Sequence, residues 1–204
     1  MTTSLLIRGI LIGLLFGIPV GAVGTLTVQR TYSYGFAAGI KTGLGSSAAD
    51  CLYAICGAFG LTFITDFLLK YQIIISVAGG CLILVMGIRL FGRKENVEEP
   101  QKQDAGNRRM FLSSFAVGIT NPAAILTFLF AFSYFGITGE IKVLQGIQIV
   151  AGVFIGTFLW WLILSASVVL LRKKTENRSF PYMNQIFGTI LILFGTVIFV
   201  RVIF

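Results

Sequence analysis

Histidine is absent from this sequence of 204 residues, and charged side chains make up only 12% of it. The missing histidine excludes Ser-His and Cys-His catalysis as well as histidine ligation of a metal, so we expect neither an enzyme nor a cofactor or metal site. Ordinary soluble domains carry roughly 25% charged residues. The shortage of charge therefore argues against a soluble protein.

Hydrophobic residues make up 56% of the chain. They recur in runs of about 20 residues, which predict an all-α, polytopic membrane protein surrounded by lipid. The net charge of +8 fits cytoplasmic loops that face anionic lipid, and no nucleic acid partner is expected. We interpret the runs as six transmembrane helices, at about Leu5–Leu26, Ile40–Ile64, Ile73–Phe91, Phe111–Phe135, Val143–Leu171 and Tyr182–Phe204.

A polar, charged stretch at residues 92–109 separates the first three spans from the last three. We interpret it as a solvated cytoplasmic linker between two three-helix repeats, residues 1–91 and 110–204. An odd number of spans per half forces two halves of the same fold into opposite orientations. The sequence therefore predicts a 3+3 inverted repeat.

Lysine and arginine are distributed unevenly between the two sides of the predicted membrane. Most of the 16 fall in the first, third and fifth loops, with Arg30 and Lys41 in the first. The positive-inside rule then puts these loops in the cytoplasm and both termini outside.

Matching helix breaks are expected in the first and fourth spans. Gly17-Ile18-Pro19 interrupts the first, and Gly118-Ile119-Thr120-Asn121-Pro122 interrupts the fourth. Proline removes an amide donor from a helix. Interruptions at corresponding positions of two halves point to the binding site of a transporter. The candidate substrate- or ion-binding residues at the breaks are Pro19, Gly21, Thr25, Asn121 and Pro122.

Glycine recurs every fourth residue along the first span, at Gly9, Gly13, Gly17 and Gly21. Residues four apart share a helix face, and small residues there let another helix approach closely. We interpret Gly9 and Gly13 as a packing strip. The glycine rows leave a homodimer open.

Asp50 is the only acidic residue well inside a predicted span. A carboxylate at the bilayer centre costs at least ~2.5–3.5 kcal/mol. Ser46 and Ser47 share its helix face and complete the candidate site. Asp50 is either a structural residue bonded to a neighbouring helix or a functional one. We favour a function, as counter-ion for a substrate ammonium or as carrier of a proton.

Residues 18–64 resemble the LysE/RhtB family of bacterial amino-acid exporters. The matching features are Pro19-Val20-Gly21, Gln29-Arg30-Thr31, Gly35, Gly39, Gly43, Gly45, Asp50 and Gly60-Leu61, and Asn121-Pro122 is similar to the second proline motif of the family. Ala22 stands where the family pattern has a further proline. The resemblance implies export of amino acids or similar small solutes across the bacterial inner membrane, driven by an ion gradient.

The sequence thus predicts a multi-pass secondary transporter whose partners are a small-molecule substrate, taken to be an amino acid, and a coupling ion, taken to be a proton. One alternative is a membrane scaffold or redox partner that transports nothing. Cys51 and Cys56 disfavour redox chemistry, because a spacing of five residues directs them to different helix faces. The other alternative is a divalent metal exporter, for which one buried aspartate and no histidine make a poor site.

Overall fold

The computed structural model describes residues 2–18, 21–59, 66–67, 70–92, 107–137, 141–174 and 182–203, and these contain helices and turns but no strand. The helices are α1 (Thr2–Phe16), α2 (Ala22–Tyr34), α3 (Phe36–Ala58), α5 (Gln72–Phe91), α6 (Asn107–Ile119), α7 (Pro122–Tyr134), α8 (Val143–Lys174) and α9 (Met183–Ile203).

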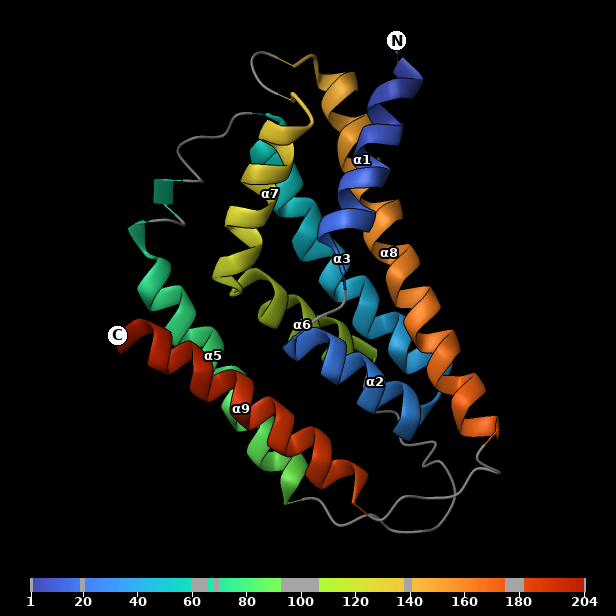
Figure 1. Cartoon of the computed structure of the whole chain (residues 1–204), viewed down its shortest axis with the longest axis vertical. Coiled ribbons are helices and arrows are strands. Elements are labelled where there is room, and N and C mark those ends of the chain that lie inside the picture. The colour runs from blue at the N-terminus through green and yellow to red at the C-terminus, as the bar shows by residue number, and fades with distance from the viewer. Residues whose placement is uncertain are drawn as a thin grey trace.

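α3 lies at the centre of the bundle, where it packs against α2, α6 and α8 (Figure 1). α1 lies along the first part of α8, and α5 lies along α9 at the side of the molecule. α3 and α8 run in opposite chain directions (Figure 1). In the first half, α1, α3 and α5 therefore pack extensively on helices of the second half, whereas α2 makes its largest contact with α3.

Both expected breaks are present. The first predicted span is two helices, because α1 ends at Phe16 and α2 begins at Ala22. Gly21, directly before α2, has a φ of 110°, a backbone conformation that favours glycine. The fourth predicted span is also two helices, α6 and α7, separated by Thr120 and Asn121. Pro19 lies outside the described residues.

The predicted first loop is wrong. α2 continues to Tyr34 and α3 begins at Phe36, so Gly35 alone connects them, with a φ of 87°. Glycine adopts such a φ without strain, so the chain can turn from α2 into α3 at this single residue. Arg30 and Lys41 consequently lie in helices rather than in a loop.

The span boundaries also differ in part. By length and composition, three helices in the described ranges can cross a membrane: Gln72–Phe91, Val143–Lys174 and Met183–Val202. These match the third, fifth and sixth predicted spans closely. α6 already begins at Asn107, within the predicted linker, while residues 93–106 of that linker lie outside the described residues.

Two clusters of buried apolar side chains hold the bundle together. The first core takes residues from α1, α3, α7 and α8 and from the turn after α7: Ile12, Tyr53, Ala54, Ala58, Phe128, Ala131, Phe132, Ile137, Ile149 and Val153. The second core takes one residue each from α2, α5, α6 and α9: Leu26, Ile83, Val117 and Leu191. Each broken span thus contributes one half-helix to each core, and the breaks lie where the two cores meet.

Glycines bring the helix backbones together between these elements. A Cβ atom added at Gly13 would lie 2.5 Å from the Val153 carbonyl oxygen and 2.9 Å from the Cα of Gly156, both in α8. Gly9 lies against the backbone of Ile149 and Gly152 in the same way. The interpretation of Gly9 and Gly13 as a packing strip is confirmed, and the helix that packs there is α8 of the same chain.

Candidate functional site

The first break leaves main-chain carbonyls without their usual helical partners. Because α1 ends at Phe16, the Leu14 carbonyl has no amide in the next turn, and it accepts a hydrogen bond of 2.7 Å from Trp160 Nε1 of α8 instead. On the other side of the break, the Gly21 carbonyl accepts from both the amide and the hydroxyl of Thr25, at 3.0 and 3.1 Å. The polar groups at this break are therefore held from both sides.

The second break is held in a comparable way. Pro122 has no amide hydrogen, so the Gly118 carbonyl lacks its helical donor and accepts from the Asn121 amide at 3.1 Å. The next carbonyl, that of Ile119, accepts a hydrogen bond of 2.6 Å from the Tyr53 hydroxyl of α3. Thr120 bonds back to the Ala116 carbonyl, at 2.7 Å through its hydroxyl.

α3 reaches both breaks. Towards the first, the Thr157 hydroxyl donates to the Ser47 hydroxyl at 3.0 Å, and the same threonine packs against Gly17, where an added Cβ would lie 2.6 Å from its methyl group. Towards the second, an added Cβ at Gly118 would lie 2.9 Å from the Cβ of Ala49 and 3.8 Å from the Cα of Ser46. One stretch of α3 therefore lies between the two breaks.

Asp50 belongs to that stretch. It follows Ser47 by three residues and precedes Tyr53 by three, so it shares a face of α3 with residues that contact each break. The residue is half-buried. Among the described residues, no side chain forms a hydrogen bond or an ion pair with its carboxylate, whereas the neighbouring Ser47 hydroxyl accepts a hydrogen bond from Thr157.

The sequence-predicted residues have different surroundings. Ser46 and Ser47 are buried, with relative exposures of 6% and 0%. Thr25 is half-buried and turns its hydroxyl to its own helix, and Asn121 is exposed at the second break. Pro122 is the first residue of α7. Ser46, Ser47, Asp50 and the two breaks are thus brought together, whereas the Thr25 hydroxyl is occupied at its own break.

Sequence reasoning missed the arrangement around Arg30. Its guanidinium donates to the Thr42 hydroxyl of α3 at 3.1 Å and, on α6, to the Met110 carbonyl at 2.9 Å and the Ser113 hydroxyl at 2.7 Å. All three acceptors are neutral. Arg30 therefore joins α2, α3 and α6. In the sequence, Gly35 was the signal for a one-residue turn, which would have placed Arg30 in a helix rather than in a loop.

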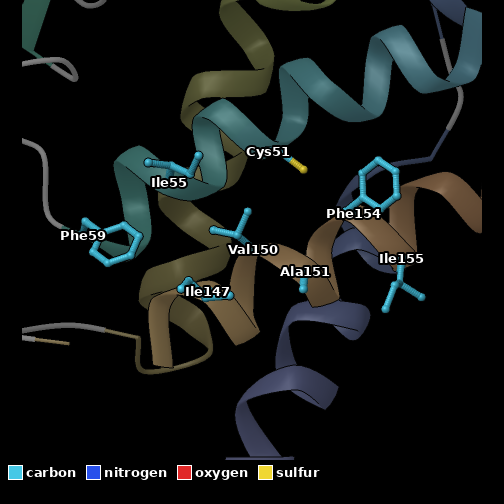
Figure 2. A pocket seen from close by; sticks show the side chains of 8 residues that line it. All are labelled: Cys51, Ile55, Phe59, Ile147, Val150, Ala151, Phe154 and Ile155. Carbon is cyan, nitrogen blue, oxygen red and sulfur yellow. The ribbon is translucent and has the colours of Figure 1, made fainter. Parts of the chain in front are cut away.

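The described pocket is not the polar site predicted from the sequence. A pocket of about 570 Å³ lies between α3 and α8. It is lined only by apolar side chains and one thiol (Figure 2): Cys51, Ile55, Phe59, Ile147, Val150, Ala151, Phe154 and Ile155. Neither Asp50 nor the serines line it. Cys51, Cys56 and Cys81 are free thiols.

Paired helix breaks in apolar helices occur in the binding sites of many secondary transporters. The sequence profile of the LysE type translocators matches residues 14–201. The chain belongs to this family.

Two curated relatives cover nearly the whole chain. One is the "Putative amino acid efflux protein YcgF" of Bacillus subtilis (strain 168), 27% identical over 91% of this chain and 90% of the relative. Another is the "Chemotactic transduction protein ChpE" of Pseudomonas aeruginosa PAO1, 24% identical over 85% of this chain and 86% of the relative. No solved structure matches the chain significantly.

Proposed function

We propose that this protein exports amino acids or similar small solutes from the cytoplasm across the bacterial inner membrane, by antiport with an ion that we take to be a proton. The observation that carries the proposal is the position of Asp50 on the stretch of α3 that lies between two helix breaks. Broken helices supply free backbone groups for substrate and ion at membrane depth in transporters.

The helix contacts support a 3+3 inverted repeat of six spans, with α1 and α2 together as the first span and α6 and α7 together as the fourth. In each half, the first part of the broken span packs on the second span of the other half, α1 on α8 and α6 on α3. The last spans of the halves, α5 and α9, pack on one another. A two-fold relation between the halves accounts for all three pairings.

The substrate class is proposed from the family and from the relative described as an amino acid efflux protein. In this proposal the carboxylate of Asp50 pairs with the substrate ammonium or carries the coupling proton. The two roles are compatible, because one carboxylate can release its proton when a cation arrives. The Leu14, Gly118 and Ile119 carbonyls lie at the two breaks and would supply backbone oxygens to the same site.

The first experiment identifies the solute. Cells that express the protein are loaded with dipeptides, and the amino acids that appear outside are quantified against cells without it. The identified amino acid is then loaded into proteoliposomes, and its efflux is measured with and without a pH gradient. We expect efflux that the gradient accelerates, and equal leakage with and without the protein would contradict export.

Asp50→Asn tests the proposed role of the carboxylate in the same vesicles. We expect efflux by this variant to lose its dependence on the gradient and to fall towards the level of protein-free vesicles. Asp66→Asn is the matched control, since it makes the same chemical change at an exposed residue and should leave efflux unchanged. Full, gradient-dependent efflux by Asp50→Asn would contradict the proposed role of the carboxylate.

A further inference from the structure

Each helix break is held by one aromatic side chain from the opposite half of the chain. Trp160 of α8 donates its indole N–H to the Leu14 carbonyl at the end of α1, at 2.7 Å. Tyr53 of α3 donates its hydroxyl to the Ile119 carbonyl at the end of α6, at 2.6 Å. The sequence does not reveal either contact, because each joins segments more than 60 positions apart.

These two carbonyls need a donor from outside their own helices. α1 ends at Phe16, so Ile18 is not placed to continue the hydrogen-bond ladder to Leu14. α6 ends at Ile119 in front of Pro122. In hydrocarbon an unpaired carbonyl is costly, since no water can replace the missing donor. One aromatic donor at each break supplies that partner.

The next residue of α8, Trp161, is also a tryptophan but forms no such hydrogen bond among the described residues. Trp161 is 3% exposed, and its indole nitrogen has no hydrogen-bond partner within the described part of the chain. The indole of Trp160 is half-buried and donates to the Leu14 carbonyl, which lies in the last turn of α1 before the first break.

We propose that Trp160 and Tyr53 are a pair of positioning residues that latch the two half-helices α1 and α6 to α8 and α3, and that transport releases the two latches separately. The proposal rests on the proposed export function. A latch of this kind has two states, because a single side-chain donor either holds the carbonyl or gives it up to water or substrate. Release at α1 loosens the first core, and release at α6 loosens the second core.

Thiol labelling tests the latches without any transport. In a chain whose three cysteines are replaced by alanine, Ala58→Cys reports on the first core and Leu26→Cys on the second, because their side chains are 1% and 3% exposed. The probe is a water-soluble maleimide, and the labelling rate is measured in detergent. Each probe is combined with Trp160→Phe or Tyr53→Phe, which remove the donor and keep an aromatic ring.

Trp160→Phe should raise the labelling rate at position 58 by roughly threefold to tenfold, the population shift that corresponds to one lost hydrogen bond, with less than a twofold change at position 26. Tyr53→Phe should do the reverse. Trp160→Tyr, which restores a donor, should return the rate at position 58 towards that of the parent. Trp161→Phe is the matched control and should change neither rate.

Equal rises at both positions would mean general loosening and would overturn the proposal, as would no rise in either variant. If Trp160→Phe does not fold, the isosteric Tyr53→Phe still decides the question through its own two rates. Efflux is scored separately in vesicles. Asymmetric labelling without export would refute the proposed function and leave the latches standing.

Discussion

Arg30 illustrates how a single side chain can fix three helices. Its guanidinium reaches two hydroxyls and one main-chain carbonyl on α3 and α6, and no acidic partner occurs among these acceptors. A planar guanidinium can donate hydrogen bonds to several acceptors at once. The compact ammonium group of a lysine cannot reach the same set of acceptors.

We therefore expect Arg30→Ala to lower the free energy of unfolding by about 1.5–3 kcal/mol, the range measured for hydrogen bonds to charged groups. Arg30→Lys should recover only a small part of the loss. The measurement is the thermal midpoint in detergent, followed by fluorescence-detected gel filtration. Arg89→Ala is the control, because Arg89 is exposed on α5. Equal midpoints for Arg30→Ala and Arg89→Ala would show that the three contacts contribute nothing to stability.

Sequence reasoning singled out Asp50 and the two serines on its helix face, but not the contacts that distant segments make around them. A carboxylate in the middle of an apolar run is conspicuous by its cost in lipid. The local sequence does not show what Trp160, Tyr53 and Arg30 bind, because their hydrogen-bond partners lie in distant segments. Local patterns do not encode such pairings, so no reading of one segment could have found them.

Between elements, packing depends on glycines that let backbones touch. The α1–α8 contact has no room for a side chain at Gly13, where an added Cβ would lie 2.5 Å from a carbonyl oxygen and 2.8 Å from the Thr157 amide nitrogen. Both obstacles are main-chain atoms, which cannot rotate away.

Gly13→Ala should accordingly force α1 away from α8 and lower the free energy of unfolding by about 1–3 kcal/mol, as overpacking does elsewhere. The thermal midpoint in detergent measures this change. Gly92→Ala makes the same substitution where the nearest atom to the new methyl group, the Ile88 carbonyl oxygen, is 3.6 Å away, so it should have little effect. A midpoint for Gly13→Ala at or above that of the parent would rule out a tight α1–α8 contact.

Ala22 begins α2 directly after the first break. Proline is favoured at the first residue of a helix, because its fixed φ suits the helix and the amide there needs no helical partner. Gly21 precedes it with a ψ of −159°, which is compatible with a following proline.

Ala22→Pro should therefore fold. Its free energy of unfolding should rise by about 0.4–1 kcal/mol, because proline lowers the entropy of the unfolded chain. Ala48→Pro, in the middle of α3, should lower the free energy of unfolding by ~3 kcal/mol or more, because it removes a hydrogen bond inside a helix. Thermal midpoints of both variants are compared with that of the parent. A large loss for Ala22→Pro would mean that α2 does not begin at this residue.

For the whole molecule, sequence reasoning predicted the helical class, both breaks and the boundaries of α5, α8 and α9, because each depends on hydrophobicity or on proline chemistry within one segment. It missed the single-glycine turn at Gly35, since the polar residues of α2 and of the start of α3 resemble a loop when their burial against other helices is unknown. Burial of Thr27, Thr31 and Thr42 is a property of the assembled bundle.

The distribution of basic residues predicts how the protein is oriented in the membrane. Arg172, Lys173 and Lys174 end α8, and Arg89 lies in the last turn of α5. Figure 1 places these two helix ends on the same side of the bundle, together with the start of α9. The positive-inside rule assigns that side to the cytoplasm. The termini should then face outward.

Reporter fusions test this assignment. Alkaline phosphatase fused after the C-terminus should be active, because its disulfides form only in the oxidising periplasm, and green fluorescent protein at the same point should be dark. A fusion within residues 92–109 should give the reverse pair of signals. Replacing Arg172, Lys173 and Lys174 by glutamine should weaken the contrast at the C-terminus, because it removes charge from the side that determines orientation. Fluorescence at the C-terminus together with active phosphatase in the linker would place the basic side outside, and the direction proposed for export would have to be reversed.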